Sequence, residues 1–507
     1  MKAHLFVGGL AALLIAGAAF AQTRGGSATV GVEQDIPGFD PLVVGVYDTG
    51  AVAAAALVFD TLTRIDDNGV VQPRLALSWS ASADFKTWTF KLRPAVTFHD
   101  GSPFNAAAVA ANYRRMMDPD NRCACNAYLG MIQRVEAVDE LTVIYRLRSP
   151  SVELPGLISP PTVTNVIHSP KAMAEGGKQY NRKPVGTGPF RLKSWISGDQ
   201  LVFERNPSYW ATGKPYLDRV TVRPMRDPGA RMAALRAGDV DIIWHDIADD
   251  IVKERKAGKL RVTTYEGSGV AGLVFNTKKP HLDDVRVRQA LRYAVDLRQF
   301  TETVAQGLSR PATDPYGPGS SVQCKDTGVI LADVEKAKAL LKDYGKPVTL
   351  KFMVTAEPRG RALGQVLQEF WKAVGITVTL EEVDQTTFVT KSLSRDFEIG
   401  GWRIIDLADP DPQMYANFKT GSPLNTANYS NAEVDKLLDA GRMTADKAER
   451  NKIYCRIAEV LNKEVPWSWG STNQYYNIAK PGLMGVHKQF SNLVDVSDAW
   501  WDKGQKK

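Results

Sequence analysis

Residues 348–383 read VTLKFMVTAEPRGRALGQVLQEFWKAVGITVTLEEV. The two ends of this stretch, 348–354 and 376–383, are rich in Val, Thr and Ile and are bounded by turn residues, which is typical of β-strands. Residues 361–375 between them have the length and composition of a helix. A strand, a helix and a second strand in this order predict a βαβ unit. The sequence therefore predicts that this part of the chain is a doubly wound α/β lobe.

The alternation of helix and strand begins near residue 280. Residues 282–296, LDDVRVRQALRYAVD, have the periodicity of an amphipathic helix, and Asp283 or Asp284 can cap its start. Its apolar face consists of Val287, Ala290, Leu291 and Ala294. We expect a last pair of helices over roughly 431–463. The second half of the chain is thus predicted to be α/β.

The first half has a different pattern, typical of antiparallel sheet. TWTFKL, residues 87–92, alternates apolar and polar side chains, as a strand with one buried face does. Further short strands and turns follow up to residue 280. Because residues 22–507 are too many for one ordinary core, we expect two or three domains.

The stretch FHDGSPFNA, residues 98–106, places a histidine, an aspartate and a serine within four positions, as a hydrolase site could. His99 and Asp100 are adjacent at a strand end, so their side chains leave in different directions. A catalytic triad needs an imidazole between the acid and the nucleophile. Asp100 in a turn and Asn105 as a helix cap explain the residue types without catalysis. We interpret the stretch as a corner between a strand and a helix.

A glycine motif lies in YEGSGVAGLVFNT, where Gly267, Gly269 and Gly272 have the spacing G-x-G-x-x-G. A dinucleotide site needs this motif between a strand and a helix. Here a strand follows instead, so we predict a flexible crossing between domains and no nucleotide site.

The N-terminus, MKAHLFVGGLAALLIAGAAFAQ, has a positive start, an apolar run and small residues before a cleavage point after Ala21. This pattern predicts a secretory signal peptide and a periplasmic location. The run is short for a membrane anchor. Removal of Lys2 with the signal changes the net charge from +7 to +6. The charges are scattered, so we expect no nucleic-acid partner.

Four cysteines remain after this cleavage: Cys123, Cys125, Cys324 and Cys455. In an exported protein they can form disulfides, with three possible pairings. Metal ligation is the alternative, but C-x-C without a second pair or a nearby histidine is a weak signature. The sequence contains no G-x-S-x-G, H-E-x-x-H or phosphate-binding loop. We therefore expect no metal, no cofactor and no enzymatic activity.

Five stretches together resemble the family-five extracellular solute-binding proteins, the dipeptide, oligopeptide and nickel receptors of bacterial ABC importers. These are LTRIDDNGVVQPRLALSWSASADFKTWTFKLRPAVTFHDGSPFNAAAV (62–109), VGTGPFRLKSW (185–195), RNPSYWATGKPYLDRVTVRP (205–224), LRAGDVDII (235–243) and FNTKKPHLDDVRVRQALRYAVD (275–296). The resemblance implies a two-lobed periplasmic-binding-protein fold of class α/β, with an extra subdomain in lobe I.

The resemblance also implies a division of the chain. Lobe I would comprise residues 22–266 and 480–507, with the extra subdomain over roughly 55–185, and lobe II would comprise 267–479. Two crossings, near 265–276 and 468–481, would act as a hinge that closes the lobes on a ligand.

Peptide receptors of this family hold the ligand's ammonium group with an aspartate in a G-W-x-x-D-x-x-D-P-D stretch. This chain has GGWRIIDLADPDPQMY, residues 400–415, where Asp406 matches that aspartate but lies one residue late from Trp402. The insertion and Arg403 leave room for an anionic solute. We expect the ligand-binding set to be Asp406, Trp402, Arg403, Arg359, Gly267, Gly269 and Tyr47.

The resemblance implies a periplasmic receptor that captures a small solute, most simply a peptide, and delivers it to an inner-membrane ABC permease. An opine, a sugar acid or another anionic solute stays open as the ligand. An exported hydrolase on a similar scaffold and a sensory binding protein without transport stay open as alternative functions. We expect a monomer.

Overall fold

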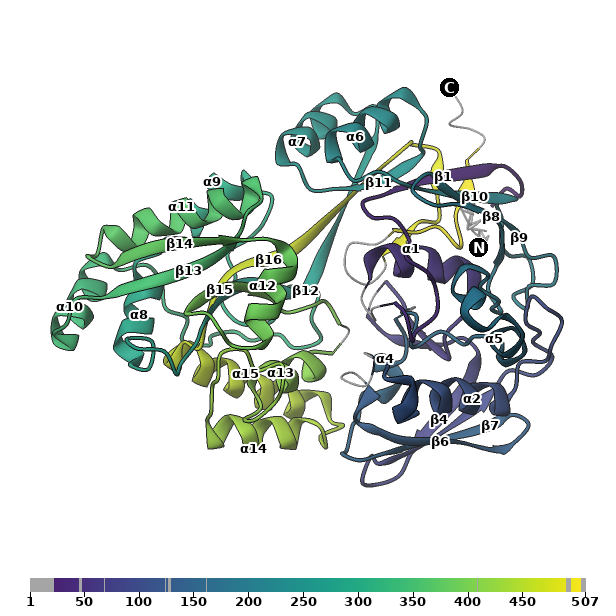
Figure 1. The fold of residues 1–507 in the computed structure, drawn as a ribbon, viewed down its shortest axis with the longest axis horizontal. Coiled ribbons are helices and arrows are strands. Elements are labelled where there is room, and N and C mark those ends of the chain that lie inside the picture. Colours follow the sequence, from purple (N-terminus) through teal and green to yellow (C-terminus); the bar gives the residue numbers. More distant parts are fainter. Residues whose placement is uncertain are drawn as a thin grey trace, which may run out of the picture.

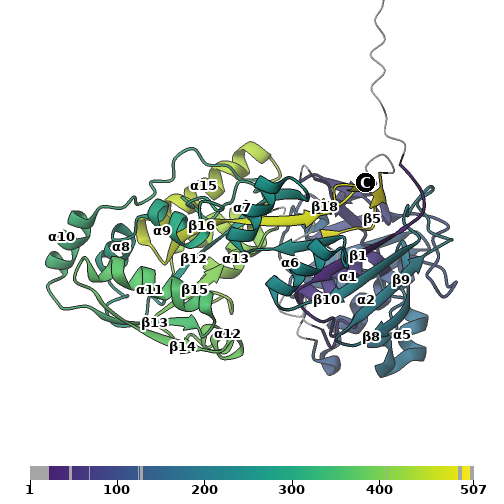
Figure 2. The same ribbon diagram turned by 90° about the horizontal axis from the view of Figure 1, so that it is seen from above.

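The computed structural model describes residues 22–44, 48–67, 69–123, 125, 129–160, 162–407, 409–488 and 494–502. Figure 1 shows two lobes side by side, joined by two long strands, and Figure 2 shows the same division from above. Lobe I contains the elements from β1 to β11 and the C-terminal strands, and lobe II contains those from α8 to α15. The predicted two-lobed α/β fold is confirmed. The predicted signal peptide lies outside the described residues.

One ten-stranded sheet runs through both lobes. Its strands, in spatial order, are β14 (Thr377–Val383), β13 (Thr349–Thr355), β15 (Ile399–Arg403), β12 (Arg261–Phe275), β16 (Trp467–Ala479), β11 (Ile242–His245), β1 (Ser27–Val32), β10 (Arg219–Pro224), β9 (Gln200–Arg205) and β8 (Phe190–Ile196). The long strands β12 and β16 pair antiparallel, from Arg261 opposite Ala479 to Val274 opposite Trp467. They overlap the two segments expected to cross between the lobes, so the crossing with the three glycines is part of a β-strand, although its pairing with β16 shifts register between Glu266 and Val270 and between Ala271 and Gly272.

Lobe I carries an extra subdomain built on a second, four-stranded antiparallel sheet. Its strands are β4 (Ala76–Ala81), β5 (Thr87–Leu92), β7 (Thr142–Leu147) and β6 (Ile132–Asp139), in that order. Helix α2 (Ala106–Met117) packs on this sheet and shares its apolar core. The alternation in TWTFKL is confirmed, because Trp88, Phe90 and Leu92 are all buried in β5.

Lobe II contains the predicted βαβ unit. Strands β13 and β14 pair in parallel, with Thr349 opposite Thr377, and helix α11 (Pro358–Lys372) connects them. Helix α8 (Val285–Tyr293) buries the predicted apolar face, and Asp284 caps it by accepting a hydrogen bond from the Arg286 N–H at 2.8 Å. The expected final helix pair is α14 (Ala432–Gly441) and α15 (Lys447–Glu464).

The other helices are α1 (Thr49–Val58), α4 (Leu154–Leu157), α5 (Pro170–Gly176), α6 (Pro228–Ala237), α7 (Ala248–Ala257), α9 (Leu297–Ala305), α10 (Val334–Tyr344), α12 (Gln385–Leu393) and α13 (Asp411–Phe418), with short 3₁₀ turns at Pro119–Asn121 and Gly177–Arg182. Short strand pairs are β2 (Thr63–Ile65) with β3 (Val71–Pro73), β17 (Leu483–Met484) with β20 (Trp500–Trp501), and β18 (His487–Lys488) with β19 (Val494–Asp495).

The four cysteines form two disulfides, Cys123–Cys125 and Cys324–Cys455. This is one of the three pairings that the sequence left open. The second bridge joins residues 131 positions apart in lobe II, and closing a loop of that length restricts the unfolded chain. The first bridge joins residues two positions apart and closes almost no loop.

We therefore expect that replacing Cys324 and Cys455 by serine lowers the free energy of unfolding by about 2–4 kcal/mol. Urea denaturation followed by fluorescence measures this change. The matched control is the double serine variant of Cys123 and Cys125, for which we expect a smaller loss. Equal losses in the two double variants would show that loop closure is not the source of the stabilisation.

Candidate functional site

Asp406 lies where the loop after β15 returns to the two long strands. The Ile404 N–H donates to the Val270 carbonyl at 2.8 Å and extends the pairing of β15 with β12. Two residues later the Asp406 carboxylate accepts the Gly269 N–H at 2.7 Å and the side-chain amide of Asn473 at 3.3 Å through Oδ1. The Tyr475 hydroxyl donates to Oδ2. The carboxylate is thus fixed to both β12 and β16.

Space for this arrangement comes from the glycines of β12. A Cβ at position 267 would lie 2.4 Å from Asp406 Oδ1, and one at position 269 would lie 2.0 Å from the Ile404 carbonyl oxygen. The register of β12 against β16 shifts between Glu266 and Val270, so the glycines lie in an irregular part of the ladder. In the structure, these glycines let the 404–406 segment approach β12 closely. The sequence predicted that they let the backbone bend or contact the ligand.

We expect Gly269→Ala to lower the free energy of unfolding by about 1–3 kcal/mol, because its methyl group would force the Ile404 carbonyl and Asp406 to move. Chemical denaturation measures the loss, and calorimetry with a bound solute measures the accompanying loss of affinity. Gly401→Ala on β15 is the matched control, because a Cβ there has no atom within 4 Å. A Gly269→Ala protein as stable as Gly401→Ala would contradict the close approach.

The Asp406 carboxylate is buried and has no cationic partner in the part of the chain that the structure describes. Its residue is only 4% exposed, and the described part of the chain gives it hydrogen-bond donors but no ion pair. Burial, followed by the negative charge of Asp406, raises the pKa of Tyr475 far above its ordinary value, so the hydroxyl stays a proton donor. The neighbouring Asp409, by contrast, forms an ion pair with Arg450.

The other predicted site residues are only partly brought together. Trp402 is half-buried, pairs with Gly272 and packs against the lobe II core. Arg403 is exposed, pairs with Ala271, and lies near enough to Tyr475 for its positive charge to act on that hydroxyl. Arg359 is the second residue of helix α11, and its side chain lies outside the described part of the structure.

Tyr47 also lies outside the described residues. Two residues that contact Asp406, Asn473 and Tyr475, are missing from the predicted set. They lie at i and i+2 on β16, and therefore on one face of the strand. The stretch PWSWGSTNQYY contained a signal for them, because it is a predicted crossing segment that is rich in polar and aromatic side chains.

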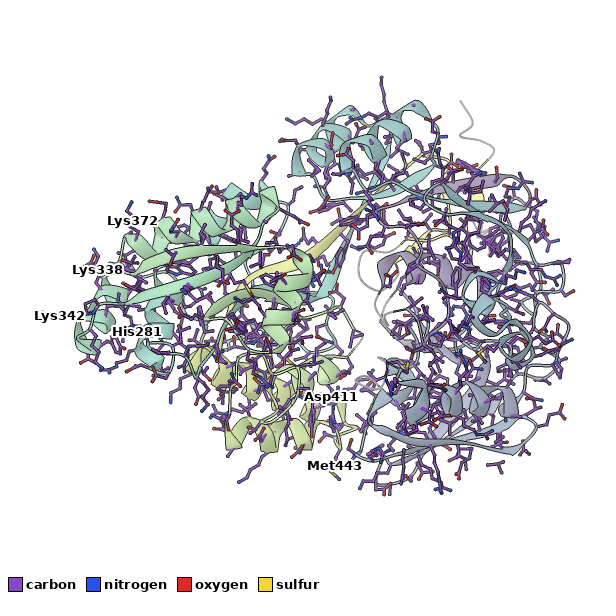
Figure 3. The ribbon with its side chains drawn as sticks, viewed as in Figure 1. His281, Lys338, Lys342, Lys372, Asp411 and Met443 are labelled. Atoms are coloured by element: carbon purple, nitrogen blue, oxygen red, sulfur yellow. A yellow bond between two sulfur atoms is a disulfide. The ribbon has the colours of Figure 1, made fainter. Side chains whose placement is uncertain are left out.

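The two lobes touch at the edge that carries Asp411 and Met443 in Figure 3. The Val152 N–H of lobe I donates to the Arg442 carbonyl of lobe II at 3.1 Å. The Glu153 carboxylate lies 3.7 Å from the Arg450 guanidinium. Burial, and then the charge of Asp409, raise the pKa of Glu153 to about 7. The lobes thus interact directly through polar groups as well as through β12 and β16.

The FHDGSPFNA stretch is a corner, as predicted. The His99 ring nitrogen Nε2 lies 2.9 Å from the Gly188 carbonyl, while Asp100 accepts hydrogen bonds from the hydroxyls of Ser102 and Ser169. Asn105 caps α2 by accepting the Ala108 N–H at 3.0 Å. The imidazole is therefore not between the aspartate and the serine, and these residues form no triad.

Within the described residues, no cluster of three or more His, Cys, Asp or Glu side chains has the arrangement of a metal site. None of the described helices has the length and hydropathy needed to cross a membrane.

Comparison with known proteins gives the family. The profile of the bacterial extracellular solute-binding proteins, family 5 Middle, matches residues 70–425. The glutathione-binding protein GsiB of Pectobacterium atrosepticum is 30% identical over 84% of this chain and 85% of its own length. The di/tripeptide-binding protein 2 of Pseudomonas aeruginosa is 28% identical over 90% and 91%.

Among solved structures, the binding protein AgaA of A. tumefaciens R10, in complex with agropinic acid, has a TM-score of 0.79 and 27% identity to this chain. The match covers 94% of this chain and 99% of AgaA. Family profile, sequence relatives and fold agree. The chain belongs to family 5 of the bacterial extracellular solute-binding proteins.

Proposed function

We propose that this protein captures a small solute with a free ammonium group, most simply a short peptide, and delivers it to an ABC permease. The observation that carries the proposal is the buried Asp406 carboxylate, which forms no ion pair with the described residues. A buried charge is costly unless it is paired. A ligand cation that enters between the lobes would supply the missing partner.

The hydrogen bonds of Asp406 leave room for such a cation. A carboxylate has about four acceptor positions, and the described donors fill three of them. The remaining position, on Oδ2 beside the Tyr475 hydroxyl, is free to accept a charge-assisted bond from an ammonium group. The relatives support this class of ligand, because glutathione and di- or tripeptides all carry a free amine.

A second candidate is an anionic opine-type solute. Arg403 favours it, because this guanidinium at the end of β15 is exposed and forms no hydrogen bond or ion pair with the described residues. AgaA, whose structure contains agropinic acid, supports this candidate. Arg403 and Arg359 are the residues we propose for a ligand carboxylate, and Trp402 and Tyr47 complete the proposed ligand-binding set.

The rest of the proposal concerns export, partners and domains. We propose cleavage after Ala21, a monomeric periplasmic protein, and an inner-membrane ABC permease as the partner. Lobe I would comprise 22–266 and 480–507, and lobe II 267–479. The two long strands would be the hinge, at Gly267–Asn276 and Trp469–Lys480, since hinge rotation is absorbed by a few residues while the lobes stay rigid.

Calorimetry with a dipeptide or tripeptide and its N-acetylated counterpart tests the ligand class. We expect the free peptide to bind and the acetylated one to bind at least about thirtyfold more weakly, because acetylation removes the charge that pairs with Asp406. Mass spectrometry of the same mixture tests for turnover, and we expect the peptide to be recovered intact. Equal affinity for both peptides would exclude the amine anchor, and cleavage of the peptide would favour the hydrolase alternative.

A further inference from the structure

A small polar cavity lies inside lobe II, apart from Asp406. It has room for a group of about the size of one water molecule. The residues that line it are Arg292, Ile330, Asn462, Val465, Trp467, Ser468 and Trp469. None of these side chains contacts Asp406, so the cavity is not part of the proposed ligand site.

Arg292 brings a buried positive charge to this cavity. The residue is 4% exposed, and its one hydrogen bond to the described protein runs from Nη1 to the Val295 carbonyl at 3.1 Å. No carboxylate among the described residues forms an ion pair with it. Asp296, whose charge acts on Arg292, is exposed and caps α9. Burial lowers the pKa of Arg292 to about 10, although the charge of Asp296 acts in the opposite direction.

The other polar side chains around the cavity add donors. Trp467 is 1% exposed, and its indole N–H has no acceptor among the described residues. The Ser468 hydroxyl also forms no hydrogen bond with them. The side-chain oxygen of Asn462 already accepts the Trp469 indole N–H at 2.7 Å, and its amide donates to Thr327 and Thr313. The residues that line the cavity thus include Trp467, whose indole N–H has no acceptor among the described residues, and they include no carboxylate.

We propose that this cavity binds one small monovalent anion of the size of chloride, held by the Arg292 guanidinium and the Trp467 indole N–H. A buried guanidinium is stable when a negative charge pairs with it, and charge-assisted hydrogen bonds to an anion use the donors that the protein leaves free. A water molecule would satisfy one or two donors but would leave the charge unpaired.

Bromide is the probe that tests this site, because it scatters X-rays anomalously and replaces chloride. Crystals of the wild-type protein soaked in sodium bromide should show an anomalous peak within hydrogen-bond distance of the Arg292 guanidinium. An ordered water without anomalous signal at this position, or an empty cavity, would overturn the proposal. This measurement needs no variant and no knowledge of the transported solute.

Melting temperatures provide a second test of the proposed anion site. We expect the wild-type protein to melt about 2 °C higher in sodium chloride than in sodium gluconate at the same ionic strength, because the anion binds only the folded state. Arg292→Met should lose this difference. Arg286→Met is the matched control on α8, because Arg286 pairs on the surface with Asp284 and Asp343. A chloride effect of the same size in wild type and Arg292→Met would overturn the proposal.

Discussion

Asp406→Asn is expected to weaken the binding of an amine-bearing solute by about thirtyfold to several thousandfold. Removing one charge of a desolvated pair costs about 2–5 kcal/mol, because the other charge stays buried without a partner, and about 1.4 kcal/mol corresponds to a factor of ten. Asparagine has nearly the same size as aspartate and keeps an oxygen for the Gly269 N–H. Titration calorimetry with the wild-type and variant proteins measures the difference.

The choice of asparagine follows from the burial of Asp406. Asp406 is only 4% exposed and its carboxylate is hydrogen-bonded to both long strands, so its removal would also affect folding. Asp406→Ala would leave the Gly269 N–H and the Tyr475 hydroxyl without an acceptor, and each such buried group costs about 1–3 kcal/mol. With Asp406→Ala, a loss of binding could therefore not be distinguished from a loss of folding.

Tyr475→Phe is the control for the asparagine variant. It removes one hydrogen bond to Asp406 but keeps the carboxylate charge, so we expect a loss of affinity well below that of Asp406→Asn. A folded Asp406→Asn protein with wild-type affinity would remove Asp406 from the site. Losses of equal size in the two variants would mean that the hydrogen-bond network matters and the charge does not.

Arg450→Met is expected to lower the free energy of unfolding by about 3–5 kcal/mol, the usual result of breaking a buried ion pair from one side. Asp409 is 5% exposed and receives two hydrogen bonds from this guanidinium, so its charge would stay buried without a partner. Arg450 also donates to the Gly441 carbonyl at 3.0 Å and lies near Glu153 of lobe I. Urea denaturation measures the loss.

The control for Arg450 lies on the same helix. Arg456 pairs with Glu433 and Glu459 at the surface, where about half of its side chain is exposed. Pairs of this kind contribute about 0–1 kcal/mol, so Arg456→Met should unfold at nearly the wild-type urea concentration. If both variants lost the same stability, the buried pair would not be a main source of stability in lobe II.

Local sequence patterns were sufficient for much of the fold. The βαβ unit around β13 and β14 follows from the composition and length of its segments, and the apolar face of α8 follows from periodicity within a few turns. The corner at FHDGSPFNA was also predictable, because turn and capping residues act on neighbouring amides. These features depend on residues that are near one another in the chain, so they can be predicted from a single sequence.

Long-range contacts could not be predicted in the same way. Asp406 meets Asn473 and Tyr475 across more than sixty positions, and no periodicity links such residues. The pairing of Cys324 with Cys455 likewise depends on how α15 packs in lobe II. The glycines of β12 were noticed from their spacing, but their purpose depends on a loop that approaches from β15. The contacts of Asp406, the disulfide pairing and the role of the β12 glycines therefore all depend on tertiary structure.

The most direct test of the central claim is to identify what the protein carries. Mass spectrometry of small molecules released by denaturing the purified wild-type protein should find a solute with a free amine, and the same preparation of folded Asp406→Asn should lack it. Recovery of a solute without an amine, or of the same amine in equal amount from the variant, would contradict the assignment of Asp406 as the anchor of the ligand.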